Sequence, residues 1–584
     1  MPARVFTIPA SAPFLPTLIE ALFGGKLGFA PAADPLALAS ATLYLPTRRA
    51  CRLARDAFLD RLCGDAAILP RIVALGDIDE DEIAFAEAAT GGIAADALAL
   101  PPALGGLERR LLLTKLIVKW VNSPELHGQS SSPLVAQTPA AACALADDLA
   151  RLIDDMTTRD VPWERLDNLV PDQFDEYWKL TLRFLKIAGD NWPKILDDLG
   201  QIEPAKRRDA LIKAEAARLS SKTDGPVIAA GSTGSIPSTA ELIATIAHLP
   251  HGAVVLPGLD TDLDEASWRL ISGDPKKKIP AVPGHPQFAM QALLTRIGIP
   301  RSAVISLAQA DGREVLLSEA MRPAMQTDVW WERARDLVFA AQADAAVSTV
   351  TVIEAASAEE EALSIAIALR EAGQDGRTAA LVTPDRTLGR RVAAALMRWN
   401  IAVEDTGGVP LAETPAGIFA RLAAEAAVAG LEPVTLLALL KHPLLRLGSG
   451  DHRHAIDILE RAVLRGPRPS RGTAGLARAL RTLRAVRDSL HPSDPRKYLS
   501  DGQIGEAESL VAKLAAALEP LEGSGAAPLS LSDLAERHRK VLAALSKHNG
   551  EQVALIGSDV TKLADVLDEL AAIPSAAGLA VASS

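Results

Sequence analysis

A strand–turn–helix unit at residues 378–417 constrains the fold of this chain more than any other stretch. Its sequence, TAALVTPDRTLGRRVAAALMRWNIAVEDTGGVPLAETPAG, begins with the apolar run Ala379–Val382. Such a run is typical of a parallel strand buried on both faces, and the following Thr-Pro-Asp ends the strand and caps the next helix. We predict this helix at about Thr387–Trp399 and a second strand at Ile401–Glu404.

Two further segments repeat this design. Residues 42–61 (TLYLPTRRACRLARDAFLDR) and residues 226–248 (PVIAAGSTGSIPSTAELIATIAH) each combine an apolar run, a turn and a helix. Three units of one type predict a repeated α/β core that serves a nucleotide or a phosphate-bearing polymer. Open α/β sheets bind ligands at the carboxyl ends of their strands. The helix predicted near 387–399 places three candidate ligand contacts there, Arg386, Arg390 and Arg391.

Around these units the sequence predicts two parallel-sheet α/β domains with all-helical insertions. Apolar residues spaced i, i+3, i+4 and i+7 indicate helices in residues 104–219 and from about residue 425 onward. The first α/β domain is therefore discontinuous, at 1–103 and 220–340, with further strands expected at 4–8, 68–77 and within 252–265. A linker at 341–347 leads to the second α/β domain at 347–424, and a helical segment that we expect to be incomplete fills 425–584.

Composition limits the partners and the compartment. The net charge of −12 means that any nucleic acid has to be bound by local patches. Cys51, Cys63 and Cys143 are too few and too scattered for a disulfide framework or a four-cysteine metal site, which predicts a reducing cytoplasm. The N-terminus does not resemble a signal peptide, and no apolar run reaches the ~18 residues of a membrane span, so no membrane partner is expected.

One local patch stands out at residues 441–487, where eleven Lys and Arg face only three Asp and Glu. Three of these arginines recur at intervals of three along one predicted helix face: Arg478, Arg481 and Arg484. DNA phosphate is a natural partner for such an excess of positive charge. An interface with an acidic subunit and a plain solvated face are the alternatives.

Four tryptophans lie in the predicted helices of residues 104–219: Trp120, Trp163, Trp178 and Trp192. Aromatic rings can stack on bases, but tryptophans at helical spacing are usually core residues. We therefore expect these side chains to be buried.

The strand expected within GAVVLPGLDTDLDE (252–265) ends in acidic residues, namely Asp260, Asp262, Asp264 and Glu265. A magnesium-binding aspartate of a motor protein stands at such a place. Here the turn Pro257-Gly258-Leu259 intervenes, so a capped loop is the favoured interpretation and no metal ligand is predicted.

The motifs of known catalytic sites are missing from the sequence. A motor ATPase needs G-x-x-x-x-G-K-[ST], but Pro9-Ala-Ser-Ala-Pro13 follows the first strand, and GSTGSIPST has no lysine. No nuclease carboxylate set ending in E-x-K, no G-x-S-x-G and no H-E-x-x-H is present. We therefore predict neither a catalytic residue nor a cofactor.

An ordered set of segments nevertheless resembles one family, the AddB subunits of alphaproteobacterial type, from residue 3 to about residue 475. These segments are VFTIPASAPFLPTL, LYLPTRRACR, PVIAAGSTGSIPSTAELI, VVLPGLD, HPQF, SEAMRP, AALVTPDRTLGRRV, DTGGVPLAETPAG and LLKHPLL. The resemblance implies a degenerate superfamily 1 helicase-like fold in a helicase–nuclease for double-strand break repair. In that complex AddA supplies the ATP motor and one nuclease, and AddB helps to guide and scan single-stranded DNA for a recombination hotspot.

The resemblance also implies roles for particular residues. Thr47, Arg48 and Arg49 match a helicase motif that contacts the DNA strand, and Arg386 matches a motif that contacts nucleotide phosphate in active relatives. Without a phosphate loop, Arg386 is expected to bind the DNA backbone or simply to pack. The hydroxyl residues Ser232 and Thr233 precede the helix predicted at Pro237. They are expected either to bind a phosphate, together with backbone amides, or to cap that helix.

The family's C-terminal nuclease domain, with its magnesium and its cysteine-bound iron–sulfur cluster, finds no match before Ser584. We expect these groups to belong to a missing C-terminal part. The favoured hypothesis is a non-motor, DNA-binding subunit in the cytoplasm, associated with the nucleoid and partnered with AddA and DNA ends or single strands. The alternatives are a scaffold that only docks AddA, and a nuclease or nucleotide hydrolase with an unorthodox site at Asp260–Glu265.

Overall fold

The computed structural model describes residues 3–28, 37–62, 68–75, 100–122, 138–168, 176–221, 225–448, 451–522, 529–548, 551–552, 557–573 and 580–581. Its contacts divide the chain into two compact units. The first unit spans residues 1–104 and 151–356, and the second spans residues 105–150 and 357–584. The domain limits expected from the sequence stay predictions.

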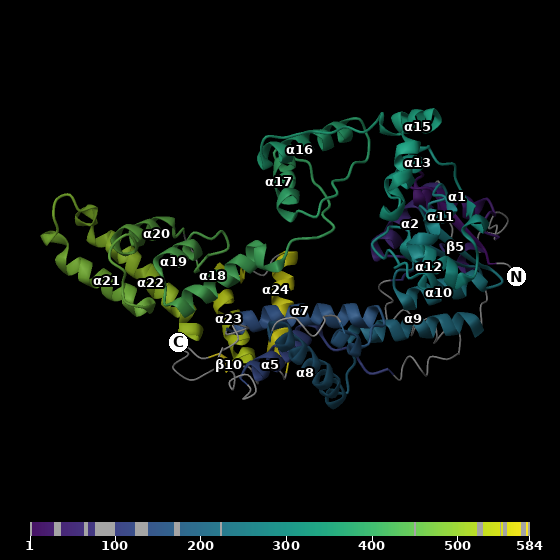
Figure 1. Cartoon of the computed structure of the whole chain (residues 1–584). Coiled ribbons are helices and arrows are strands. Elements are labelled where there is room, and N and C mark those ends of the chain that lie inside the picture. Colours follow the sequence, from purple (N-terminus) through teal and green to yellow (C-terminus); the bar gives the residue numbers. More distant parts are fainter. Residues whose placement is uncertain are drawn as a thin grey trace. The chain divides into compact units, whose positions relative to one another are not determined.

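A six-stranded parallel sheet forms the centre of the first unit (Figure 1). The strands follow the order β3-β2-β4-β5-β1-β6, and every neighbouring pair is parallel. This sheet confirms the α/β class and each of the strands predicted before residue 260, and it adds the short edge strand β6. The bounds are β1 (Val5–Ile8), β2 (Thr42–Leu45), β3 (Arg71–Ala74), β4 (Val227–Ala230), β5 (Gly252–Pro257) and β6 (Ile305–Ser306).

Helices cover both faces of this sheet, because successive side chains of a strand point to opposite faces. In β1, Val5 joins an apolar cluster with Leu242 and Leu293, whereas Phe6 and Ile8 join a separate cluster on the other face. The first cluster is formed with α9 (Pro204–Ser221), α10 (Pro237–His248) and α12 (Phe288–Ile297), and the second with α1 (Phe14–Phe23) and α2 (Arg48–Leu62).

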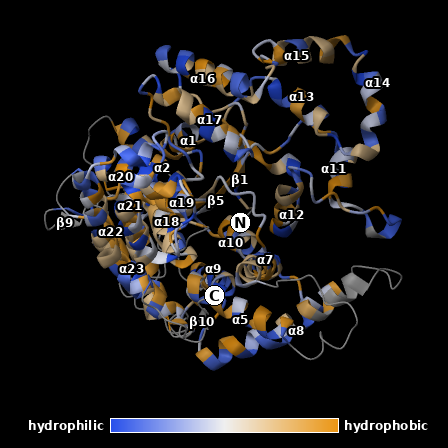
Figure 2. Ribbon diagram, turned by 90° about the vertical axis from the view of Figure 1, so that its left-hand side faces the viewer, coloured by the Kyte–Doolittle hydropathy of each residue, from blue (hydrophilic) through white to orange (hydrophobic). Residues whose placement is uncertain are grey.

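The described residues of 104–219, between β3 and β4, are mainly helical, as predicted. Their helices are amphipathic, and Figure 2 shows α8 striped in hydrophobic and hydrophilic residues. Trp120 and Trp192 are buried, and Trp163 is half-buried, which confirms the core interpretation for the first two. The side chain of Trp178 lies outside the described residues. The helices are α5 (Gly106–Val121), α7 (Pro139–Thr158), α8 (Glu176–Leu199) and α9.

A buried polar cluster attaches α9 to β2. The Tyr44 hydroxyl donates a hydrogen bond to Glu215, and the Arg218 guanidinium donates two, at 2.7 Å each, to the same carboxylate. Burial, and then the nearby Glu215 charge, raise the pKa of Tyr44, so the hydroxyl keeps its proton and remains a donor.

The second unit is helical throughout its large apolar core. The helices of this core surround buried residues such as Leu436, Leu480 and Leu514, and they agree with the helical prediction after residue 425. Two short antiparallel pairs, β7 (Leu529–Ser530) with β10 (Ala580–Val581) and β8 (Lys547–His548) with β9 (Glu551–Gln552), accompany them. The helices are α18 (Pro415–Ala429), α19 (Pro433–Leu440), α20 (Arg453–Leu459), α21 (Gly472–Val486), α22 (Asp501–Glu522), α23 (Leu531–Ser546) and α24 (Ser558–Ala572).

The predicted second parallel sheet does not form in residues 347–424, all of which the structure describes. The expected strands at 379–382 and 401–404 have no ladder partner, and Val382 is 93% exposed. The two helices of this segment, α16 (Ala358–Gln374) and α17 (Arg386–Met397), bury only a small shared cluster that includes Ala366 and Leu396. A parallel sheet needs cover on both faces, and this helix pair does not provide it.

The predicted linker at 341–347 is also different in the structure, since these residues end the helix α15 (Leu337–Val347). Asp336 caps this helix by accepting the backbone N–H groups of Val338 and Phe339. The alanine-rich sequence lacks an apolar stripe but favours helix by intrinsic propensity. Two short helices precede it, α13 (Arg313–Ala320) and α14 (Trp330–Arg333).

The two faces of α2 provide a test of this fold. Phe58 is fully buried between α2 and the sheet, while its neighbour Leu59 is 59% exposed. We expect Phe58→Ala to destabilise the first unit by about 3–5 kcal/mol, because it leaves a cavity, and Leu59→Ala to change stability by less than about 0.5 kcal/mol. Urea unfolding of both variants measures the difference, and equal effects would contradict this placement of α2.

Candidate functional site

The candidate residues of the first unit gather at the carboxyl edge of its sheet. Because β2 pairs with β4, β4 with β5 and β5 with β1, the loops that leave these strands are neighbours along this edge. Thr47 follows β2, Ser232 and Thr233 follow β4, and the acidic residues 260–264 follow β5. Ligands of open α/β sheets bind at such an edge.

Thr47 fixes the beginning of α2. Its Oγ1 accepts the backbone N–H of Ala50 at 3.1 Å, as a residue that caps a helix does. Arg48 and Arg49 therefore stand in the first turn of α2, directly after β2, with Arg48 exposed and Arg49 half-buried. The structure thus places this predicted trio at the sheet edge.

The loop after β4 depends on two glycines. Gly231 and Gly234 have positive φ angles of 78° and 66°, which glycine adopts without strain. A Cβ at Gly231 would lie 3.3 Å from the Phe14 ring and 3.4 Å from Pro46, so the loops after β1, β2 and β4 meet here. Close packing of three loops explains why this turn carries glycine.

Neither hydroxyl residue of that loop caps α10. The N-cap position is Ile236, which makes no side-chain capping bond, whereas Ser232 Oγ accepts the N–H of Gly234 at 3.3 Å. The capping alternative for Ser232 and Thr233 is therefore wrong, because α10 begins at Pro237, beyond their reach.

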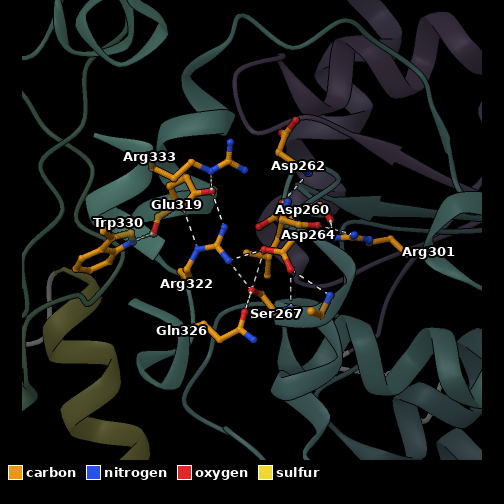
Figure 3. Close-up of polar contacts among 12 residues, drawn as sticks. Asp260, Asp262, Asp264, Ser267, Arg301, Glu319, Arg322, Gln326, Trp330 and Arg333 are labelled. Carbon is orange, nitrogen blue, oxygen red and sulfur yellow. Dashed lines mark hydrogen bonds and ion pairs between the residues drawn. The ribbon is translucent and has the colours of Figure 1, made fainter. Parts of the chain in front are cut away.

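The acidic loop after β5 is a capped loop, as favoured from the sequence. Asp264 caps α11 (Glu265–Ser272) by accepting the N–H groups of Ala266 and Ser267 at 3.1 and 2.9 Å. Asp260 Oδ1 accepts the N–H groups of Asp262 and Leu263, both at 2.9 Å. Figure 3 shows these carboxylates bonded to their own loop, with Asp262 pointing away from the others.

Two arginines hold this loop from outside (Figure 3). Arg322, with a side chain only 2% exposed, contacts Asp264 and donates to both Glu319 oxygens, at 2.9 and 2.6 Å. Arg301 donates to the carbonyls of Asp260 and Leu263, and its guanidinium lies 4.6 Å from the Trp268 ring centre. The two guanidinium groups therefore make hydrogen bonds to the loop that water would otherwise make.

These contacts determine the charge state of the loop. Burial alone raises the pKa of Asp264, but hydrogen bonds from the Ser267 amide and from Arg322 outweigh it and lower the value to about 2. The hydrogen bond to Glu319 raises the pKa of Arg322. The described residues contain no group of three or more His, Cys, Asp and Glu arranged to hold a metal ion.

The loop after β1 binds a carboxylate of the protein itself. Glu314 Oε1, from α13, accepts the Ser11 backbone N–H at 3.0 Å and the Ser11 hydroxyl at 2.5 Å. In phosphate loops the backbone N–H groups of the corresponding turn hold phosphate oxygens. Burial raises the pKa of Glu314, but the hydrogen bonds from Ser11 outweigh it and lower the pKa, so this carboxylate stays charged.

In the second unit, the arginines of α17 are largely engaged with acids. Arg386 donates to both Asp405 oxygens, at 3.0 and 2.7 Å, and to the Gly408 carbonyl at 2.8 Å. A Cβ at Gly407 would lie 2.6 Å from this guanidinium, so the glycine permits the contact. Arg390 pairs with Glu413 at 2.7 Å, whereas Arg391 is exposed.

The basic stretch at residues 441–487 is neutralised in part. Six of its eleven cations pair with carboxylates: Lys441 and Arg465 with Glu460, Arg453 with Asp451, Arg468 with Glu432, Arg484 with Glu508, and Arg487 with Asp501. Arg478 and Arg481 are exposed on α21 and have no ion pair in the described part of the chain. They are the strongest phosphate-contact candidates of this unit.

Sequence reasoning missed Arg301, Arg322 and Glu314. Their partners lie far away along the chain: Arg322 is 58 positions from Asp264, and Glu314 is 303 positions from Ser11. The usable signal was local: Glu319 and Arg322 are charged residues within the segment SEAMRP, which contributed only to the family resemblance.

The cysteines do not fit an iron–sulfur cluster. Four thiolates normally hold such a cluster, and the chain contains three cysteines. Cys51 lies in α2 and is buried in the apolar cluster against the sheet, Cys143 lies in α7, and Cys63 lies outside the described residues. Of the helices that the structure describes, none combines the length and the apolar character of a membrane span.

Comparison with known proteins adds no identification. No family model matches the chain, and no curated protein matches it at a significant level.

The buried arginine gives a first test of this site. Arg322→Ala leaves Glu319, 9% exposed, without its main partner, so we expect a loss of about 3–5 kcal/mol of unfolding free energy. Arg333→Ala removes a half-exposed partner of the same carboxylate, at 3.1 Å, and should cost less than about 1 kcal/mol. Comparable small losses in urea unfolding would show that Arg322 does not hold the loop.

A pH series tests the charge on Asp264. Its pKa falls from 3.8 to about 2 on folding, so the ionised carboxylate stabilises the folded state above pH ~4 and loses this effect as the pH falls toward 2. The side chain is 42% exposed, and after screening we expect about 1 kcal/mol. Asp264→Asn keeps a capping side chain, so its stability deficit against the natural protein should narrow between pH ~5 and ~3. A deficit independent of pH would contradict this assignment.

Proposed function

We propose that the chain is a non-motor, DNA-binding subunit of an AddAB-type helicase–nuclease that processes double-strand breaks for recombinational repair. In this proposal it is an AddB-type subunit with a degenerate superfamily 1 helicase fold, and it guides and scans single-stranded DNA. The main observation that supports this proposal is an arrangement of loops. The loops with arginine and hydroxyl residues are neighbours at the carboxyl edge of the sheet, while the loop after β1 binds Glu314.

The chemistry of the loop after β1 supports a subunit without a motor. A nucleotide triphosphate needs free backbone N–H groups and a lysine at this place. Residues 9–13 contain neither glycine nor lysine, and the Ser11 N–H donates to Glu314. A second anion would meet this carboxylate at close range, and like charges repel.

Phosphate contacts supply most of the affinity for single-stranded DNA, together with stacking. Each unit offers its own candidates, Arg48 and Arg49 at the sheet edge of the first and Arg478 and Arg481 on α21 of the second. Arg386 and Arg390 are weaker candidates than Arg478 and Arg481, because a phosphate would have to displace Asp405 and Glu413.

The alternative of an enzyme with an unorthodox site at residues 260–265 is less well supported. Asp260 and Asp264 accept backbone N–H groups, and Asp264 also contacts Arg322. Carboxylates with these partners have fewer lone pairs for a metal ion or a water nucleophile. A scaffold that only docks an AddA-type subunit remains the second candidate, favoured by the arginines that are already paired with acids.

The proposal includes partners and location. An AddA-type subunit would supply the motor, and the complex would act on DNA ends and single strands in the cytoplasm, at the nucleoid. The family's iron–sulfur cluster and nuclease magnesium are not assigned to any residue of this chain.

DNA binding is tested by removing two cations at a time. We expect Arg48→Ala with Arg49→Ala, and separately Arg478→Ala with Arg481→Ala, to weaken single-strand binding roughly tenfold at low salt and to reduce the salt slope by about 1.4. The loss should be uniform across DNA sequences, because phosphates carry no base information. Fluorescence anisotropy over a series of salt concentrations measures both quantities.

The matched control for the Arg478 and Arg481 variant is Arg453→Ala with Arg468→Ala, which removes the same charge from arginines that are paired with Asp451 and Glu432. This control should weaken single-strand DNA binding by less than about threefold. If all three double variants bind DNA as the natural chain does, but the chain still associates with an AddA-type partner, the scaffold hypothesis replaces the DNA-binding one.

A further inference from the structure

A cleft of about 430 Å³ opens at the carboxyl ends of β1, β5 and β6 in the first unit. The loops after these three strands and the helix α13 form its walls. The DNA-contact candidates Thr47–Arg49 and Ser232–Thr233 follow β2 and β4 instead and do not line it. The cleft is therefore a separate feature of the same sheet edge, with no role in the proposed DNA contacts.

The charged groups of this cleft have one sign. Asp260, Asp262 and Glu314 line it, and its described lining contains neither lysine nor arginine. Between the acids the walls are apolar, with Leu317 and Met321 among them. Such a lining repels phosphates and attracts a cation that carries an apolar stem.

Two buried polar atoms in the lining have no hydrogen-bond partner among the described residues, Ser318 Oγ and Glu314 Oε2. Ser318 is only 6% exposed and stands one turn after Glu314 on α13. Buried polar atoms without a partner are uncommon in folded proteins, and each calls for an explanation.

Other polar residues of the lining are satisfied. His285 Nε2 bonds to the Met321 carbonyl at 2.7 Å, and its Nδ1 accepts the Gln287 N–H. The Gln287 amide bonds to Gly258 and Asp260, and the Thr7 hydroxyl accepts the Leu259 N–H. The unused hydrogen-bonding capacity thus includes one hydroxyl and one carboxylate oxygen, with Asp262 exposed beside them.

We propose that this cleft binds an alkylguanidinium group, such as the end of an arginine side chain. The guanidinium is held by Asp262, Glu314 and the Ser318 hydroxyl, and the alkyl stem packs against Leu317 and Met321. This assignment does not depend on the proposed function, because none of these residues belongs to the DNA-contact candidates.

The chemistry favours a guanidinium over other cations. Its planar fork offers five N–H donors to several separate acceptors, and it is hydrated more weakly than an ammonium group, which suits apolar walls. A calcium or magnesium ion prefers a shell of about six or more oxygen ligands, more than this lining brings together. Burial, and then the charges of Asp260 and Glu314, raise the pKa of Asp262, and the opposing charge of Arg301 only partly offsets them.

The test uses the full chain and two matched probes, butylguanidinium and its neutral isostere butylurea, measured by calorimetry. We expect butylguanidinium to bind with a Kd on the order of 0.1–1 mM, the range open to so small a ligand, and butylurea at least tenfold more weakly. Glu314→Gln and Asp262→Asn should each weaken the binding of butylguanidinium by about tenfold. Glu332→Gln, an exposed acid outside the lining, is the control and should change nothing.

Because Glu314→Gln also alters the contact with Ser11, the variant Ser318→Ala provides an independent test of the cleft. It removes the unpartnered hydroxyl, so the free protein should melt at the same or a higher temperature while butylguanidinium binds several-fold more weakly. A purely structural serine would lower the melting temperature and leave binding unchanged.

A third probe, the peptide acetyl-Gly-Arg-Gly-amide, distinguishes two sources of the group. Binding at least tenfold tighter than butylguanidinium would assign the cleft to an arginine of a polypeptide, and equal or weaker binding would assign it to a small free guanidine. The proposal is overturned if butylguanidinium does not saturate the chain at about 10 mM. It is also overturned if butylurea binds equally well or if Mg-ATP competes for the cleft.

Discussion

A parallel strand has to be covered on both faces, and this requirement explains where the chain forms a sheet. In the first unit α1 and α2 cover one face and α9, α10 and α12 cover the other, so six strands assemble. Between residues 347 and 424 only α16 and α17 are present, and their shared cluster is small. The apolar runs there have strand-like sequences without a sheet to join, which leaves Val382 in solvent.

The sheet edge is maintained by interactions across long stretches of sequence. Arg322 and Arg301 hold the loop after β5, and Glu314 holds the loop after β1. These contacts use carboxylates and amides that would face phosphates and metal ions in a motor protein. The same edge also carries arginine and hydroxyl residues after β2 and β4, and an acidic cleft beside β1 and β5. The two parts suit ligands of opposite charge.

The parts of the fold that follow from local sequence were predictable. Unbroken apolar runs located five strands, and Asp385 was recognisable as a capping residue. The edge strand β6 has only two residues, both exposed, and leaves no hydrophobic signal. The ion pair of Arg322 with Asp264 joins residues 58 positions apart, and the hydrogen bonds between Glu314 and Ser11 join residues 303 positions apart. A local sequence pattern cannot reveal contacts over such separations. Helix α15 was missed because alanine-rich sequence carries helical propensity without an apolar stripe.

The contact between Glu314 and Ser11 limits what substitutions in this loop can do. Backbone amides of a phosphate loop attract anions even where a lysine is missing. Here the Ser11 N–H and hydroxyl already donate to Glu314, a carboxylate of the protein itself. Placing glycine and lysine in residues 9–13 would therefore not create a phosphate site as long as Glu314 is kept. Changes at two distant positions would be needed together, which no single substitution supplies.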